Sequence, residues 1–260
     1  MRSLLLVLTL ALTLTSLTTP AAAHPRPPAV IFDTDMDFDD AATLAYLSQE
    51  HRAGRIELRA ITVTSAGAGL PGRAIRYARC LADRLGLRGV AIADDSRTGP
   101  HSFPADLREP FDRVLTAATP GCAGDESPSR TRAPELIRQL VREDPGIPVI
   151  ATEPLTSLAA ALPHSPARLT SMGGAVHVPG NLCCGTPPEF DGTQEFNYWL
   201  DPGAARSVVT RGTGVFRMVS LDAANEVLIT DASSTGSPPT TARRPRTPYW
   251  RSSRIPRCGR

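Results

Sequence analysis

Five aspartates stand within eight residues near the start of the chain, in the segment V-I-F-D-T-D-M-D-F-D-D at residues 30–40. The apolar residues that open this segment predict the end of a buried strand. The apolar residues that follow it recur at helical spacing, so we expect a helix there. The aspartates therefore crowd a turn between a strand and a helix. Carboxylates this close repel one another, and they stay ionised together only around a cation or among many hydrogen-bond donors.

Hard oxygen ligands of this kind favour Ca²⁺ or Mg²⁺ over zinc. A solvated acidic loop is the competing interpretation, which the apolar strand and helix on either side disfavour. An EF-hand loop is excluded, because its sixth position from Asp33 is Phe38 instead of Gly and its twelfth is Leu44 instead of Glu. A phosphoryl-transfer D-x-D motif with Asp33 as nucleophile stays open as a weaker alternative, and it would indicate a Mg²⁺-dependent phosphatase.

The rest of the chain alternates strand and helix signals. Strands are expected at 56–63, 90–93, 148–151, 169–172 and 215–219, and helices at 73–85, 134–143, 155–162 and 201–210. Residues 95–130 are rich in Pro, Gly, Ser and Asp, which predicts a long loop with a short helix near 111–118. This alternation predicts a doubly wound, mostly parallel α/β sheet flanked by helices. Such sheets bind ligands at the carboxyl ends of their strands.

Six short motifs, in the same order along the chain, resemble the inosine-uridine-preferring nucleoside hydrolase family. The aspartate cluster is similar to the family signature D-T-D-x-G-x-D-D. The other matches are A-I-T-V-T at 60–64, E-P-L-T-S-L-A at 153–159, S-M-G-G at 171–174 with G-N at 180–181, E-F-N at 195–197 with D-P-G-A-A at 201–205, and V-S-L-D at 219–222. The resemblance covers residues 30–230 and implies the family's α/β fold.

The resemblance implies hydrolysis of the N-glycosidic bond of ribonucleosides to ribose and free base, with a Ca²⁺-bound water as nucleophile. Breaking this bond builds positive charge on the sugar, which nearby carboxylates stabilise. By resemblance, Asp35 is the general base and a calcium ligand, Asp40 is a bidentate calcium ligand, and the carbonyl of Thr156 is a third ligand. The implied substrate contacts come from Asp39, Met172, Asn181, Glu195 and Asn197.

Some of these residues have simpler interpretations. For Met172 a core role is the favoured interpretation, and a surface loop is the simpler interpretation for Glu195 and Asn197. His101 and His177 are candidate leaving-group acids, although single loop histidines are common without a role.

Several positions depart from the family pattern. Asp37 stands in place of a glycine, Glu153 in place of the glycine before the Pro-Leu-Thr turn, and Ser157 in place of an asparagine. The asparagine that the family carries after its second strand is missing, and Ser65-Ala66-Gly67 stands there. A ribose contact is therefore lost or moved.

The last 30 residues differ in composition from the rest of the chain. Residues 231–260 hold seven Arg, five Pro and one acidic residue without apolar periodicity, which predicts a disordered tail. A basic partner-binding arm and a frameshifted or truncated end are its two interpretations. The family has further helices here and a late aspartate that completes its calcium site. The alternative function is therefore a catalytically impaired remnant that binds ribosides or metal.

The composition fits one exported globular domain. A chain of 260 residues, 41% of them hydrophobic, can form one α/β domain with a large core. A net charge of +2 indicates no nucleic-acid partner and no stable membrane association, and it does not exclude a homo-oligomer. Arg2, the apolar segment 4–17 and the alanines at 21–23 predict a signal peptide at 1–23, cleavage after Ala23 and secretion. We expect the α/β domain at 24–230 and the tail at 231–260.

The five cysteines are an odd number, so at least one is unpaired or bonded to another chain. The adjacent pair Cys183-Cys184 has no second set of cysteines or histidines at metal spacing, which favours a loop disulfide or two loop thiols.

Overall fold

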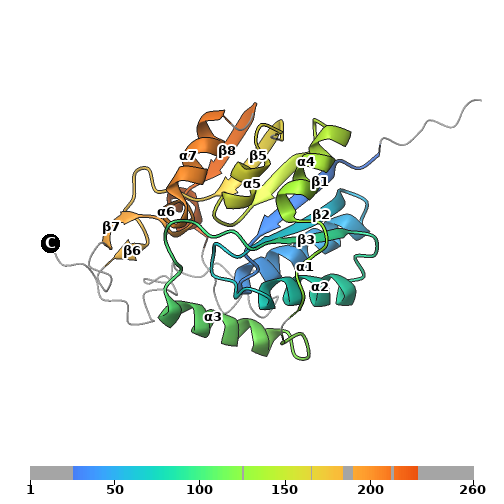
Figure 1. Cartoon of the computed structure of the whole chain (residues 1–260), viewed down its shortest axis with the longest axis horizontal. Helices are drawn as coiled ribbons and strands as arrows, with labels where there is room; N and C mark the ends of the chain where they lie inside the picture. The colour runs from blue at the N-terminus through green and yellow to red at the C-terminus, as the bar shows by residue number, and fades with distance from the viewer. Residues whose placement is uncertain (1–25, 125, 165, 184–189, 212–213, 228–260) are drawn as a thin grey trace, which may run out of the picture.

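The computed structural model describes residues 26–227, except residues 125, 165, 184–189 and 212–213. The expected signal peptide and tail, as well as Cys184 and Cys258, lie outside the described residues. The sheet at the centre has six strands in the order β3-β2-β1-β4-β5-β8, and all neighbouring pairs are parallel (Figure 1). Its strands are β1 Ala29–Thr34, β2 Glu57–Thr64, β3 Ala91–Asp95, β4 Pro148–Ala151, β5 Arg168–Met172 and β8 Val215–Val219. The predicted doubly wound, mostly parallel sheet is confirmed.

Helices cover both faces of this sheet (Figure 1). One face carries α1 Phe38–Arg52 and α2 Arg73–Arg84, with α3 Ala105–Ala118 packed against α1; the other carries α4 Ala133–Glu143, α5 Thr156–Ala161 and α7 Pro202–Arg211. A hydrophobic core lies on each face of the sheet, because successive side chains of a strand point to opposite faces. Ile31 packs with residues of α4, α5 and α7, whereas Phe32 packs with residues of α1 and α2.

Four short elements were not predicted. The strands β6 Leu182–Cys183 and β7 Asp191–Gln194 pair in antiparallel fashion, and α6 Phe196–Leu200 and α8 Leu221–Ala224 are single helical turns. None of them has enough residues to show a periodic apolar pattern.

The helix expected near 111–118 starts earlier, at Ala105. Pro110 lies inside α3, where it removes one backbone donor and would normally end a helix. Leu107 and Phe111, on either side of it, pack in a cluster around buried Phe103. Apolar burial therefore outweighs the local cost of the proline, and the prediction that residues 105–110 form a loop was wrong.

The strand order places a switch point between β1 and β4. After β1 the chain builds β2 and β3 on one side, and it then crosses to build β4, β5 and β8 on the other side. In parallel sheets of this kind, a crevice opens at the carboxyl ends of the two strands where the order reverses. The aspartate cluster follows β1, and residues 152–156 follow β4. The fold thus brings together two of the segments singled out from the sequence.

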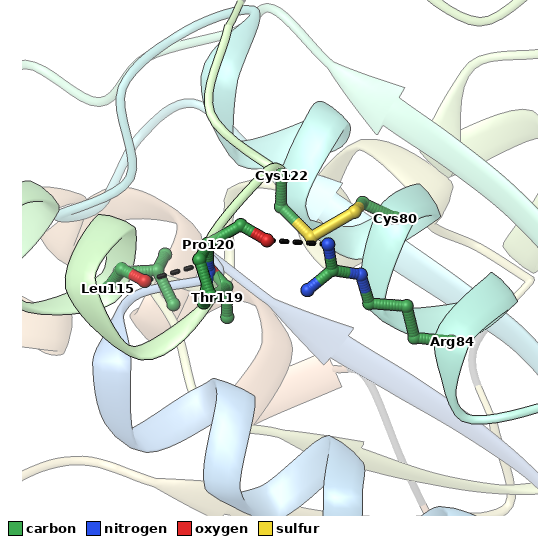
Figure 2. The surroundings of a disulfide bond; sticks show 6 residues. All are labelled: Cys80, Arg84, Leu115, Thr119, Pro120 and Cys122. Atoms are coloured by element: carbon green, nitrogen blue, oxygen red, sulfur yellow. Dashed lines mark hydrogen bonds between the residues drawn. A yellow bond between two sulfur atoms is a disulfide. The ribbon is translucent and has the colours of Figure 1, made fainter.

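A disulfide between Cys80 and Cys122 ties α2 to the segment that follows α3 (Figure 2). Arg84, one helical turn after Cys80, donates to the carbonyl of Pro120 in the same segment. Cys122 is completely buried. The pairing fits an oxidising compartment, and it leaves Cys183 and the two cysteines outside the described residues.

Replacing both Cys80 and Cys122 by serine should lower the free energy of unfolding by about 2–4 kcal/mol, because the bridge closes a long loop in the unfolded chain. The two cysteines are 42 residues apart in sequence. Urea denaturation of wild type and double variant measures the difference. The control repeats the comparison under reducing conditions. Wild type then lacks the bridge, so its free energy of unfolding should match that of the double variant. An unchanged unfolding midpoint in the oxidised proteins would show that this bridge does not form.

No helix in the described part of the chain is long and apolar enough to cross a lipid bilayer.

Candidate active site and metal centre

The turn between β1 and α1 is set by Met36 and Asp37. Met36 has a positive φ of 58°, and Asp37 is extended at φ −86°. Asp37 caps α1, since its side chain accepts the backbone N–H groups of Asp39 and Asp40 at 3.2 and 3.4 Å. Because aspartate is a favoured N-cap residue, Asp37 takes the family's glycine position without backbone strain.

Asp40 is held by three donors. Its Oδ2 accepts the hydroxyl of Thr34 and, at 2.9 Å, the N–H of Met36. Its Oδ1 accepts the hydroxyl of Thr152 at 2.6 Å, just beyond the end of β4. Asp40 is only 3% exposed. The carboxylate is therefore fixed between the carboxyl ends of β1 and β4.

Asp35 contacts the loop that follows β2. Its Oδ2 accepts the N–H of Ala68 at 2.6 Å. A Cβ atom on Gly67 would lie 1.8 Å from the same oxygen, so only glycine permits this approach. Where the family has an asparagine side chain, this chain brings a glycine-containing loop and a backbone N–H donor to Asp35.

Asp35, Asp37 and Asp40 form a cluster that can hold a metal ion. One carboxylate oxygen of each lies within 4.8 Å of the others. Burial is the largest cause that raises the pKa of all three, and repulsion from neighbouring aspartates adds to it. A cation would relieve both costs. The donors are all hard oxygens, so the residues present fit Ca²⁺ or Mg²⁺.

A second pair of acids lies beneath this cluster. Asp33 and Glu153 are both completely buried, and Asp33 accepts the hydroxyl of Thr62 at 2.5 Å. Burial raises the pKa of Asp33 to about 6. Burial, and then the charge of Asp33, raises the pKa of Glu153 well above its usual range. Glu153, which stands where the family has a glycine, thus adds a second buried acid beside Asp33.

The metal-free protein should become less stable as the pH rises. A carboxyl whose pKa is raised by folding stabilises the fold below its unfolded pKa, and this contribution is lost as the pH rises through the folded value. For Asp33 the window runs from 3.8 to about 6, which corresponds to roughly 3 kcal/mol. Urea denaturation in EDTA at pH 5 and pH 7.5 covers the upper part of this window and should show about 1.4 kcal/mol of the loss, and Asp33→Asn should reduce it. A pH profile identical in Asp33→Asn and wild type would contradict this assignment.

The predicted ribose contacts lie around the ends of β4 and β5. The Nδ2 of Asn197 donates to the carbonyls of Thr152 and Met172 at 3.1 and 3.3 Å. Glu195 caps α6, and it accepts the N–H groups of Asn197, Tyr198 and Gly174 at 3.0, 3.1 and 2.8 Å. Thr152 thus touches Asp40 through its hydroxyl and Asn197 through its carbonyl, and it joins the aspartate cluster to the predicted ribose contacts.

Three further residues predicted from the sequence are Asn181, Asp39 and Thr156. Asn181 is exposed, and its Oδ1 accepts the N–H of Phe196 at 2.9 Å, beside Glu195. Asp39 is exposed, and its charge raises the pKa of Asp35 and Asp40. The hydroxyl of Thr156 donates to Asp201 at 2.8 Å.

Among the interactions of the described residues, neither candidate leaving-group acid contacts Asp35, Asp37 or Asp40. His101 stacks on Trp199 with ring centroids 4.2 Å apart. The backbone N–H of His177 donates to Asp222 at 2.8 Å.

Sequence reasoning missed Thr34, Thr152 and the loop around Ala68. Thr34 stands inside the D-T-D signature and Thr152 directly before the E-P-L-T turn, so a hydroxyl next to a predicted carboxylate motif was the available signal. The N–H of Ala68 has no signal of its own, because every residue except proline carries one.

Comparison with known proteins identifies a family whose sequence profile matches most of the chain. A sequence profile described as inosine-uridine preferring nucleoside hydrolase matches residues 30–251, and its range continues past Thr230, where we expected the resemblance to stop. A search of curated proteins gave no match.

Solved structures of nucleoside hydrolases have the same fold. The inosine-uridine preferring nucleoside hydrolase from Bacillus anthracis is 27% identical, with a TM-score of 0.63 over 78% of this chain and 68% of that one. A plant nucleoside hydrolase is 26% identical, with a TM-score of 0.63 over 78% of this chain and 63% of that one. The purine-preferring ribonucleoside hydrolase from Gardnerella vaginalis, 23% identical with a TM-score of 0.64, matches 78% of this chain and 63% of its own, and it supports the fold alone. This chain thus spans 63 to 68% of the length of these three proteins.

Proposed function

Because the chain belongs to the inosine-uridine preferring nucleoside hydrolase family, we propose that it hydrolyses ribonucleosides to ribose and free base at a Ca²⁺ site built on Asp35 and Asp40. The observation that carries the proposal is the convergence of Asp35, Asp37 and Asp40 within 4.8 Å at the strand switch point. Thr152 connects this cluster to Asn197. Charge for the sugar cation and donors for its hydroxyls therefore lie side by side.

Asp35 is the general base in this proposal. The N–H of Ala68 orients one of its oxygens at 2.6 Å, and the carboxylate would take the proton from an attacking water. The carboxylates of Asp35 and Asp40 also stabilise positive charge as it develops on the ribose ring. When bound, Ca²⁺ would lower the pKa of a water and hold the sugar diol.

The remaining ligands and substrate contacts follow the family resemblance. The carbonyl of Thr156 would be a further calcium ligand. Asp39, Asn181, Glu195 and Asn197 would hydrogen-bond the ribose, and Met172 would pack beside it. Glu195 already accepts three backbone N–H groups, so it acts first by fixing the Asn197 backbone and the loop at Gly174.

The buried position of Asp33 disfavours the phosphatase alternative. A phosphoryl-transfer nucleophile must reach its substrate, and Asp33 is completely buried beneath the cluster with its Oδ1 held by Thr62. The second alternative, a riboside- or metal-binding remnant without turnover, draws on the shorter span of this chain relative to the solved nucleoside hydrolases.

Product formation from different substrates distinguishes these functions. The purified chain is incubated with inosine, with uridine and with p-nitrophenyl phosphate, and reducing sugar and phosphate are measured. We expect reducing sugar from a nucleoside and no phosphate, and we expect Asp35→Asn to abolish sugar release. Calcium binding without sugar release from any ribonucleoside would favour the remnant instead, and phosphate release would favour the phosphatase.

We also propose that the protein is exported, with cleavage after Ala23. The Cys80–Cys122 disulfide supports this proposal, because such bonds persist mainly in oxidising compartments. Intact mass of the protein from a culture supernatant tests it, and the retention of residues 1–23 would contradict it.

A further inference from the structure

Arg108 reaches from α3 toward the loop that follows β2. Its guanidinium donates to the carbonyl of Gly67 at 2.6 Å, and its Cζ lies 5.7 Å from the centre of the Phe103 ring. Its Nε is buried and has no hydrogen-bond partner in the described part of the chain. The arginine is therefore drawn inward by one specific carbonyl instead of extending into water, where long cationic side chains are usually found.

That carbonyl lies one residue before the donor to the catalytic aspartate. The next residue, Ala68, gives its N–H to Asp35 Oδ2 at 2.6 Å. The loop backbone lies directly against Asp35, since a Cβ on Gly67 or Gly69 would meet Asp35 atoms at 1.8 and 1.9 Å and only glycine fits at both positions. The loop is thus packed on Asp35 from one side and hydrogen-bonded by Arg108.

The helix that carries Arg108 is itself well fixed. Tyr77 on α2 shares a hydrogen bond with Thr116 on α3 at 2.6 Å, and Arg73 pairs with Asp112 at 2.6 Å. The Cys80–Cys122 disulfide fastens the segment that follows α3. Arg108 therefore projects from a helix that is anchored along its C-terminal half.

We propose that Arg108 is a positioning residue for the reaction, which holds the 65–69 loop so that the N–H of Ala68 fixes the Asp35 carboxylate. This inference rests on the proposed function, in which Asp35 is both general base and calcium ligand. No signature motif of the sequence contains Arg108, and it acts on Asp35 only through the backbone of the loop.

A positioning role and a charge effect of Arg108 predict opposite changes in calcium affinity when the residue is replaced. Arg108 is a cation near the cluster, and its charge lowers the pKa of Asp35. Removing that charge would, by itself, strengthen the binding of another cation, because like charges repel. Removing the loop's support would weaken binding, because an outer partner of a metal ligand typically contributes about 10–100-fold to affinity. The sign of the change therefore identifies which effect dominates.

The test compares three variants on α3. Arg108→Met keeps an apolar stem and removes charge and donor, and Arg108→Lys keeps a charged donor. Arg113→Met is the matched control, because Arg113 is 69% exposed and pairs with Glu109 on the surface. Calcium affinity is measured by calorimetry, and exchange of the Ala68 amide hydrogen by mass spectrometry or NMR. Thermal unfolding confirms that each variant is folded. If Arg108→Met fails to fold, Arg108→Gln, which is shorter but polar, takes its place.

We expect Arg108→Met to bind calcium about tenfold or more weakly, with faster exchange at Ala68. Arg108→Lys should recover part of both losses, and Arg113→Met should match wild type. Calcium affinity in Arg108→Met that equals or exceeds that of Arg113→Met overturns the proposal. Absence of nucleoside hydrolysis in wild type would refute the proposed function, whereas these two measurements would still decide the role of Arg108.

Discussion

Replacing Asp40 by alanine should abolish calcium binding and, with it, nucleoside hydrolysis. Asp40 contributes a carboxylate to the three-aspartate cluster and is only 3% exposed. Loss of a buried charge opposite its partner typically costs about 3–5 kcal/mol, which corresponds to roughly two to four orders of magnitude in Kd. Calorimetric titration with Ca²⁺ measures the loss, and ribose release from inosine should fall in parallel.

This experiment must distinguish a loss of stability from a loss of calcium binding. Asp40→Ala removes the acceptor of the Thr34 hydroxyl and one of the two acceptors of the Thr152 hydroxyl and of the Met36 N–H, so it also destabilises the turn. Asp40→Asn keeps the shape and one acceptor oxygen while it removes the charge, and we expect it to lose calcium as well. Asp83→Asn, an exposed change on α2, is the matched control. Equal calcium affinity in Asp40→Asn and Asp83→Asn would refute the assignment.

Hydrolysis should depend strongly on the sugar hydroxyls. A site whose groups bind substrate hydroxyls discriminates against an analogue without them, by on the order of 10⁴-fold in kcat/KM, because its own polar groups are left unpaired. Here the ribose would meet the metal cluster, Asp39 and Asn197. We therefore expect inosine to be hydrolysed far faster than 2′-deoxyinosine or 3′-deoxyinosine.

The variant Asp39→Asn shows whether this selectivity comes from the named residues. Asp39 is exposed at the start of α1, so its replacement should leave the fold intact. We expect Asp39→Asn to lower kcat/KM for inosine more than kcat/KM for 2′-deoxyinosine, so that the ratio of the two values becomes smaller. Comparable rates of wild type on inosine and 2′-deoxyinosine would contradict a ribose-chelating site.

The sheet was predictable from short apolar segments that alternate with helical patterns. Those at 148–151 and 215–219 coincide with β4 and β8, although β8 lies at the edge of the sheet and is largely exposed. The position of the aspartate cluster after β1 was equally predictable from local pattern. The start of α3 was not, because the packing of Leu107 and Phe111 around Phe103 overrides Pro110 only in three dimensions.

The candidate site was predictable where the chemistry is carried by carboxylates in a motif. Asp35 and Asp40 meet as the motif implies. The partners that fix them come from distant segments: Thr152 lies 112 residues after Asp40, and Ala68 lies 33 residues after Asp35. Thr152 stands beside the E-P-L-T motif, but its sequence position does not tell which carboxylate it contacts, and nothing local distinguishes Ala68 from other alanines. Likewise, five cysteines allow many pairings, and only the packing of α2 against the end of α3 selects Cys80 and Cys122.

The most direct test of the central claim is the product balance of inosine hydrolysis with and without calcium. Inosine, hypoxanthine and ribose are quantified over time in the presence of Ca²⁺, after chelation by EDTA, and after calcium is restored. We predict equal amounts of ribose and hypoxanthine with Ca²⁺, none after chelation, and recovery when Ca²⁺ returns. Hydrolysis that continues unchanged in EDTA would contradict the account, as would a calcium-loaded protein that releases no base from any ribonucleoside.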